Sequence, residues 1–202
     1  MAVTNGYCTV QQVRDQLGDV SSRASEDQIE RAINAVSRAI DRWCGRRFWL
    51  DGTATIRRYR PRNPYSVLIE DIGSIDGLAV ETGHGDGALT GWTEDDFLLE
   101  PLDAVAEGAA YAWWKITAIG GKTFPVGSRR PGLRVTALHG WSATPDEVTE
   151  AAILKAAALW KRKDAVWGVA DFGEYGAVRI SRRDGDVIEL LGGFARATPP
   201  EV

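Results

Sequence analysis

The chain of 202 residues lacks several features that mark particular classes of protein. It has two cysteines, Cys8 and Cys44, too few for the disulfide framework of a small secreted domain, so we expect a reducing compartment. A single disulfide between them stays open at this stage. No run approaches the roughly 20 apolar residues of a membrane span. The first residues show neither the basic nor the apolar part of a secretory signal, so we expect no export by that route.

Basic charge and catalytic patterns are also scarce. Lys and Arg number 24 against 28 Asp and Glu, a net charge of −4 that argues against a sequence-independent nucleic-acid binder. Neither His84 nor His139 has a second ligand at metal-binding spacing, so we predict no metal site. The run Gly120-Gly-Lys-Thr123 lacks both the first glycine and the following helix of a phosphate-binding loop, and predicts a turn. We therefore predict no catalytic residues, no cofactor and no enzyme activity.

Acidic pairs and the second histidine are interpreted as structural. Asp71 with Asp76, and Asp95 with Asp96, are read as solvated turn residues, because the sequence does not place two carboxylates across a cleft. His139 ends a predicted strand, so we expect a packed or hydrogen-bonded histidine rather than a catalytic base.

Helix starts, in contrast, are well marked. Three times a Ser or Thr is followed three residues later by Gln or Glu, the capping-box pattern: Thr9 with Gln12, Ser25 with Gln28, and Thr144 with Glu147. Pro145 suits the first position of the third helix. The pattern predicts helices over about 10–17, 26–44 and 145–163, the second closed by Gly45.

The helix predicted over 145–163 is apolar on nearly every side. Between Ala151 and Trp160 the only polar side chain is Lys155, so the helix needs cover on several faces. One partner is the apolar stripe of the second helix, formed by Ile29, Ile33, Val36, Ile40 and Trp43. We expect the rest of the cover from the β insertion or from another subunit, and the residues predicted at a subunit interface are Ile153, Leu154, Ala157 and Trp160.

Residues 52–141 read as a β-rich insertion. Short strand-like runs separated by turn signals are predicted at Thr53–Tyr59, Val67–Ile69, Ile75–Val80, Phe97–Leu99, Lys115–Ala118 and Leu133–Leu138. The fold class is therefore α+β, an antiparallel pair of long helices plus short helices, with residues 1–51 and 142–202 forming the helical part. Near the end we expect a strand at 177–181, a short amphipathic helix at 184–191 and disorder over 197–202.

The strongest basic cluster, Arg57-Arg-Tyr-Arg-Pro-Arg62, has three open interpretations. It suits an edge strand whose charges and proline prevent pairing with another chain, a protein interface, or contact with phosphate. Alternation places Arg58 and Arg60 on one face of a strand and Arg57 and Tyr59 on the other. With Trp92, Trp113 and Trp114 nearby, a carbohydrate- or nucleic-acid-binding β module is the alternative function.

The order of several segments resembles the head-to-tail adaptor (connector) proteins of long-tailed bacteriophages. The segments that carry the resemblance are Tyr7–Leu17, Ala39–Phe48, Val135–Trp141, Pro145–Leu159, Val178–Ser181 and Val187–Leu191. The resemblance implies a non-enzymatic virion protein of the neck, assembled in the host cytoplasm as a ring commonly of twelve subunits. That ring joins the portal to a stopper or tail protein, and DNA passes through it without sequence-specific binding.

The resemblance also implies a portal contact at the C-terminal segment. It falls on Val178, Arg179, Ile180, Val187, Leu190, Leu191 and Phe194. We expect Val187, Leu190 and Leu191 to serve this attachment more than folding, because a short amphipathic end after a loose segment suits a peptide that orders on docking.

Overall fold

The computed structural model describes residues 2–18, 25–84, 88–105, 110–127, 129–162, 169–171, 177–179 and 185–201. The chain divides into two compact units. A helical unit comprises Met1–Gly45 and Pro145–Ala195, and a β unit comprises Arg46–Thr144 and Arg196–Val202. The α+β class is as predicted. The β unit starts earlier than expected and also takes the last residues of the chain. No helix among the described residues is long and apolar enough to cross a membrane.

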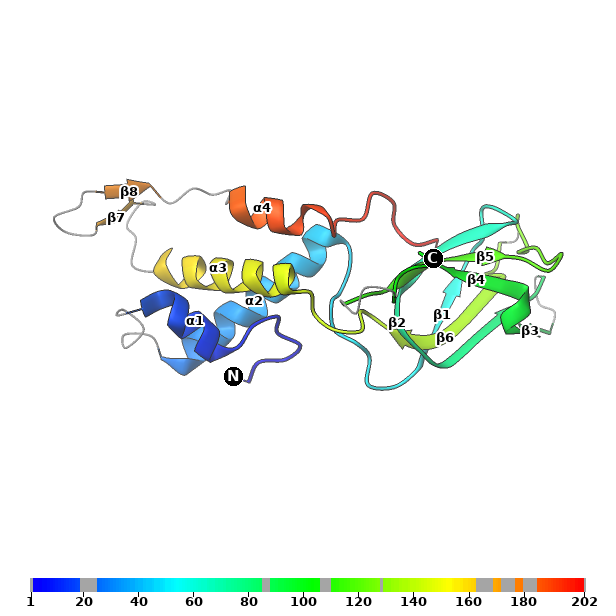
Figure 1. Cartoon of the computed structure of the whole chain (residues 1–202), viewed down its shortest axis with the longest axis horizontal. Helices are drawn as coiled ribbons and strands as arrows, with labels where there is room; N and C mark the ends of the chain where they lie inside the picture. The colour runs from blue at the N-terminus through cyan, green and yellow to red at the C-terminus, as the bar shows by residue number, and fades with distance from the viewer. Residues whose placement is uncertain are drawn as a thin grey trace. The chain divides into compact units, whose positions relative to one another are not determined.

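The helical unit contains α1 (Val10–Leu17), α2 (Glu26–Cys44), α3 (Asp146–Lys161) and α4 (Gly185–Gly192) (Figure 1). The predicted capping box before α1 is present: the Gln12 amide donates to Thr9 Oγ1 at 3.2 Å, and the Thr9 amide donates to Gln12 Oε1 at 2.8 Å. α2 ends as predicted at Gly45, which adopts the left-handed conformation with φ 62°. Local sequence signals therefore fix these helix ends.

The start of α3 differs from the prediction. Pro145, not Thr144, is the N-cap residue, and no side chain caps the helix. The Thr144 hydroxyl instead donates to the carbonyl oxygen of Phe48 at 3.1 Å, a contact inside the β unit. Ser25, before α2, also makes no side-chain cap bond. The capping boxes predicted at these two starts are wrong. At Thr144 the cause is the tertiary partner that takes the hydroxyl.

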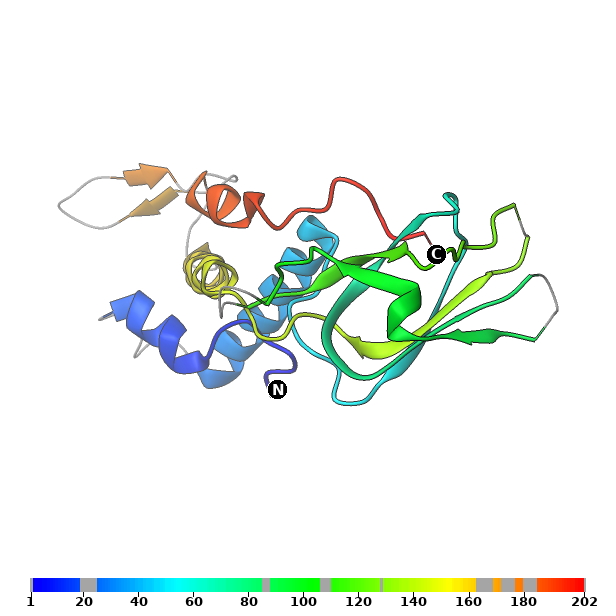
Figure 2. The same ribbon diagram turned by 45° about the vertical axis from the view of Figure 1, so that its right-hand side comes forward.

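α3 lies between α4 on one side and α1 and α2 on the other, and Figure 2 shows it surrounded by them. Four of its residues, Val148, Ala151, Ala152 and Ala156, are completely buried. Alanines allow neighbouring helices to approach closely, which explains how a single helix contacts three others. The cover for this apolar helix, which the sequence assigns in part to the β insertion or another subunit, thus comes largely from α1, α2 and α4 of the same unit.

The apolar stripe of α2 is buried at Ile29, Ile33, Val36 and Ile40, as predicted. Trp43 is the exception, with 47% of its surface exposed. Cys44, four residues after Ile40, takes the buried position in the last turn. A step of four residues from Ile40 reaches Cys44 on the same face of the helix, because an α-helix repeats every 3.6 residues.

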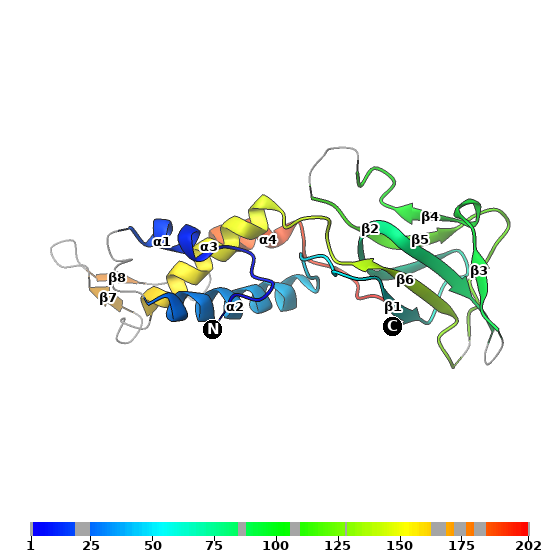
Figure 3. The ribbon, with the colours of Figure 1, turned by 90° about the horizontal axis from the view of Figure 1, so that it is seen from below.

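The β unit is built on one antiparallel sheet in the order β1-β6-β2-β5-β4, with β3 paired to β2. Its elements are β1 (Thr55–Tyr59), β2 (Ser66–Thr82), β3 (Thr90–Trp92), a short 3₁₀ turn (Glu94–Asp96), β4 (Phe97–Glu100), β5 (Trp113–Ala118) and β6 (Leu133–His139). β2 is the central strand: β5 pairs with its first half, and β6 pairs with it from Ile72 to Thr82 (Figure 3).

β2 runs continuously through 17 residues, where the sequence predicts two separate strands, Val67–Ile69 and Ile75–Val80. The Asp76-Gly77 pair, a residue type combination typical of turns, marks an irregularity within the strand. The register against β6 shifts between Ser74 and Ala79, and Gly77 has φ 71°. An unpaired stretch with a glycine in the left-handed region is a usual way to bend a strand without ending it. β3 is a strand that the sequence analysis did not predict.

A dense apolar core supports the sheet. Tyr59, Ile69, Ile72, Ile116 and Val135 have no exposed surface. At its edge Trp92 stacks on Phe124, with ring centroids 4.8 Å apart. The inward position of Tyr59 and the exposure of Arg58 confirm the alternation predicted for β1.

The C-terminal residues pack within the β unit. The predicted disorder of 197–202 is therefore wrong for residues 197–201, which the structure describes. The Glu201 amide donates to the Leu68 carbonyl at 3.0 Å, and the Arg60 amide donates to the Glu201 carbonyl at 2.7 Å. The Arg62 amide donates to the Glu201 carboxylate at 2.7 Å. Separately, β7 (Val169–Asp171) pairs with β8 (Ala177–Arg179) in a small antiparallel ladder.

Candidate interaction surfaces

The residues predicted at a subunit interface lie on α3. Ile153, Ala157 and Trp160 are buried by their own chain, and the Trp160 indole donates to Gln28 Oε1 at 3.3 Å. Leu154 is partly exposed, and Leu159, which the sequence analysis did not select, is 40% exposed. Any surface that α3 offers to another subunit therefore includes Leu154 and Leu159 rather than the three buried side chains.

The residues predicted to contact the portal divide into three groups. Val187 and Leu191 are each 3% exposed within the helical unit, which contradicts the expectation that they contribute little to folding. Leu190 and Phe194 are partly exposed. Val178 and Arg179 belong to β8, and Ile180 lies outside the described residues. Of the predicted set on α4 and after it, Leu190 and Phe194 are thus the side chains that remain accessible.

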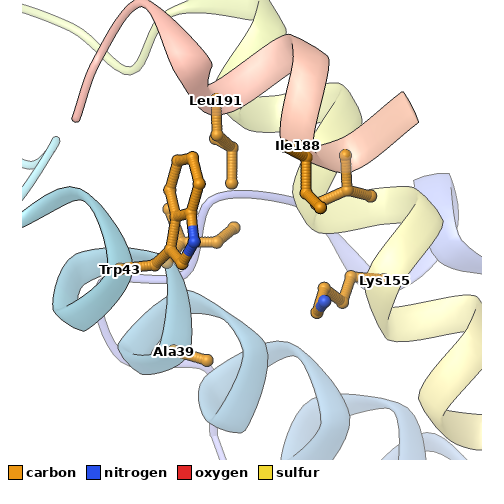
Figure 4. A pocket seen from close by; sticks show the side chains of 7 residues that line it. Ala39, Trp43, Lys155, Ile188 and Leu191 are labelled. Carbon is orange, nitrogen blue, oxygen red and sulfur yellow. The ribbon is translucent and has the colours of Figure 1, made fainter. Parts of the chain in front are cut away.

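A groove with basic side chains runs along the helical unit. Figure 4 shows its first pocket, of about 160 Å³, with Trp43 from α2, Lys155 from α3, and Ile188 and Leu191 from α4 around it. A second pocket of about 180 Å³ shares Ala39 and Lys155 with the first and extends to the end of α3. We call this surface the basic groove and define it by Ala39, Trp43, Lys155, Leu159, Arg162 and Ile188.

Acidic side chains gather at another face of α4. A shallow depression there is lined by three carboxylates, together with a glycine and two apolar side chains that the sequence analysis placed at the portal contact. We call it the acidic face and define it by Glu147, Asp186, Glu189, Leu190 and Phe194. It has no basic residue among its described lining residues.

The arginine cluster of β1 is only partly exposed. Arg57 Nε lies 3.1 Å from Glu70 Oε2, an ion pair on the sheet. Arg58, Arg60 and Arg62 are exposed, but the main chain of the last two holds Glu201. The cluster therefore anchors the C-terminal residues through its backbone, and its exposed guanidinium groups retain the three interpretations given above.

Asp71 is the most connected buried charge of the β unit. Its carboxylate accepts from Arg46 Nη1 at 3.2 Å, from the Trp141 indole at 3.2 Å, and from Arg196. Arg46 also lies 4.8 Å from the centroid of the Trp114 ring, a cation–π contact. The interpretation of Asp71 as a solvated turn residue is wrong, because two cations and an indole that are distant in sequence converge on it.

The tryptophans proposed as a binding platform do not form one exposed surface. Trp113 is only 9% exposed and belongs to the core, and Trp92 stacks on Phe124. Trp114 is covered in part by Arg46. A sugar or base would need an open aromatic face, so this arrangement does not favour the alternative function.

The other sequence candidates are structural. The side chain of His139 is fully buried, and neither ring nitrogen has a hydrogen-bond partner among the described residues. Burial, aided by the charge of Arg57, lowers the pKa of His139 and keeps the ring neutral. Gly120 and Gly121 form the predicted turn, with positive φ at both. The described residues contain no group of three His, Cys, Asp or Glu that could hold a metal ion.

The thiols are not redox partners of each other. Cys8 and Cys44 are both buried and form no disulfide. Burial raises the pKa of the Cys8 thiol to about 11, so the thiolate that would react is disfavoured.

Solved structures with the same fold exist, although no family model and no curated protein matches the chain. The neck of an empty GTA (gene transfer agent) particle, computed with C6 symmetry, contains a chain that superposes with a TM-score of 0.59 at 17% identity. The neck of a native GTA particle, computed with C12 symmetry, gives a TM-score of 0.56 at 16% identity. Each match covers 100% of this chain and 97% of the other. The shared fold therefore includes the helical unit and the inserted β unit together.

Proposed function

We propose that this chain is a structural protein of the neck of a phage-like particle. The observation that carries the proposal is the likeness of fold over the whole chain to two neck structures, at TM-scores of 0.59 and 0.56. Likeness in one domain alone would be weaker support, because a common fold serves many functions. Here a helical core interrupted by a β insertion is matched from end to end.

In its finer form, the proposal is a ring of twelve subunits that joins the portal to a stopper or tail protein. The C12 and C6 symmetries of the two similar necks support a closed ring. The net charge of −4 suits a protein whose ring conducts DNA without gripping it, because phosphate contacts need a basic surplus. The role is mechanical and needs no catalytic residue, metal or cofactor.

The portal contact is proposed at the C-terminal segment, from Val178 to Phe194. Within it, Leu190 and Phe194 are apolar and partly exposed, so they are available to a partner. Val187 and Leu191 support that contact indirectly, because they fix α4 on the helical unit.

Negative-stain microscopy of the purified chain mixed with the portal of the same particle tests the proposal. The expected result is a second ring stacked on the portal. Replacing Leu190 and Phe194 by Asp is expected to abolish stacking, whereas Ile75→Asp, at an exposed position of β2, leaves it unchanged. The absence of a stacked ring at every protein concentration would reject the proposed function.

A further inference from the structure

The basic groove exposes more apolar surface than an isolated helical unit needs. Trp43 is 47% exposed, Leu159 is 40% exposed and Ile188 is 43% exposed, and all three border the two connected pockets. Large apolar side chains that gather around a concavity, rather than being scattered singly, indicate an interaction site. The chemistry of the groove then decides which partner fits.

Charge divides the groove from the acidic face. Among the described residues that line the two pockets of the groove, the charged ones are Lys155 and Arg162, and none is acidic. The acidic face has Glu147, Asp186 and Glu189. Each surface combines charge of one sign with apolar side chains, so the two are complementary.

Helix dipoles explain only part of this division. Glu147 and Asp186 lie in the first turns of α3 and α4, and Arg162 follows the last turn of α3, where such charges stabilise a helix. Lys155 and Glu189 lie in helix interiors, where the dipole has little effect. The dipole therefore does not account for those two charges.

The two surfaces lie on different sides of α4. At 3.6 residues per turn, Asp186, Glu189 and Leu190 share one face of the helix, while Ile188 and Leu191 share another. The pockets have the same division, since Ile188 lines the groove and Glu189 lines the acidic face. One helical unit therefore presents two different, complementary surfaces, which is the requirement for a head-to-tail contact between identical chains.

We propose that the basic groove binds the acidic face of a second copy of this chain. Lys155 and Arg162 of one copy then face Asp186 and Glu189 of the next, which leaves Leu190 and Phe194 to the portal contact proposed above. Such a contact joins unlike surfaces, so its repetition produces a ring when the rotation from one copy to the next closes, rather than a two-fold dimer. The inference rests on the proposed ring and names the surfaces that close it.

Reciprocal charge reversal tests the contact, with ring formation measured by mass photometry and negative stain, alone and on the portal. Lys155→Glu with Arg162→Glu makes the groove acidic, and Asp186→Lys with Glu189→Lys makes the acidic face basic. Each double variant alone is expected to lose ring assembly by about tenfold or more. An equal mixture of the two is expected to restore it, because every contact in an alternating ring is then complementary. Misfolded variants would not be rescued by mixing.

Arg129→Glu with Arg130→Glu is the matched control, because it changes the net charge by the same amount at exposed positions before β6. It is expected to leave assembly unchanged. If it reduces assembly as much as the groove variant does, or if mixing gives no rescue, the inference is overturned. Rings that form normally from the groove variant but no longer bind the portal would make the portal the occupant. A wild-type chain that forms no ring, alone or on the portal, would remove the proposed function itself.

Discussion

The guanidinium group of Arg196 lies against the carboxylate of Asp71, 125 positions earlier in the chain, and the two side chains are 7% and 3% exposed. Arg46 and Trp141 bind the same carboxylate. The chain passes between its two units after Gly45, after Thr144 and after Ala195. The buried carboxylate of Asp71 thus binds three residues of the β unit, and each of them lies within a few positions of a point where the chain passes from one unit to the other.

Asp71→Asn is expected to destabilise the β unit strongly. The substitution removes the charge that Asp71 supplies to two buried guanidinium groups, a change that typically costs about 3–5 kcal/mol. Thermal unfolding followed by tryptophan fluorescence measures the loss. Asp76→Asn, at an exposed position of the same strand, is the control and is expected to change the free energy of unfolding by less than about 0.5 kcal/mol. Equal effects of the two variants would contradict the role given to Asp71.

Substitutions at two adjacent leucines of α4 are expected to have different effects, one on the stability of the fold and the other on binding to the portal. Leu191 is 3% exposed, so Leu191→Ala removes buried methyl groups and is expected to cost about 2–5 kcal/mol in urea unfolding. Leu190 is partly exposed, and Leu190→Ala is expected to cost less than about 1.5 kcal/mol while weakening binding to the portal. A larger loss of stability from Leu190→Ala would mean that α4 packs through its other face.

Stability is expected to fall as the pH drops below about 6.5, the ordinary pKa of histidine in an unfolded chain. Burial lowers the pKa of His139 in the folded state, so between these two pKa values the unfolded chain binds a proton that the folded chain does not. The slope is at most about 1.4 kcal/mol per pH unit. Urea unfolding from pH 7.5 to 5.5 measures it, and His139→Leu is expected to flatten the curve. His84→Asn, at an exposed position, is expected to leave the slope unchanged.

Gly140→Ala is expected to disrupt the end of β6. Gly140 has φ 115°, a backbone conformation that L side chains rarely adopt. An added Cβ would also lie 2.0 Å from the carbonyl oxygen of Trp49, so the segment between α2 and β1 would have to move. We expect a loss of at least about 2 kcal/mol, seen as a lower melting temperature. Gly52→Ala is the control, since nothing lies within 4 Å of the place that a Cβ would take there. A melting temperature equal to that of Gly52→Ala would contradict the close approach.

Local sequence patterns predict the ends of the helices, but they do not predict contacts between residues that are far apart in the chain. Thr9, Gln12 and Gly45 act within one or two turns of a helix end, so the sequence alone places them. Thr144 has the same local signal, but its hydroxyl binds Phe48, which is 96 positions away. The role of Asp71 is out of reach of the sequence for the same reason, because its partners are scattered along the chain and no spacing rule joins them.

The candidate surfaces show the same limit. The apolar character of α3 is evident from its sequence, but which of its side chains remain exposed depends on where α1, α2 and α4 pack. The spacing of Trp43 fits the buried stripe, but Cys44 fits it equally well, and the packing of the helices buries Cys44 instead. The basic groove combines three helices from opposite ends of the chain, so no single stretch of sequence reveals it.

The hydrogen bond from Thr144 to Phe48, across 96 positions, has a consequence for folding order. If the strands of residues 46–144 pair first, the two ends of this segment come together before α2 meets α3. The helical core then closes a loop of a few residues instead of one of nearly a hundred, which saves about 2–3 kcal/mol of chain entropy at roughly 0.6 kcal/mol per halving of loop length. An insertion of this kind can grow or shrink at its outer strands while the helices that flank it keep almost the same entropy of closure.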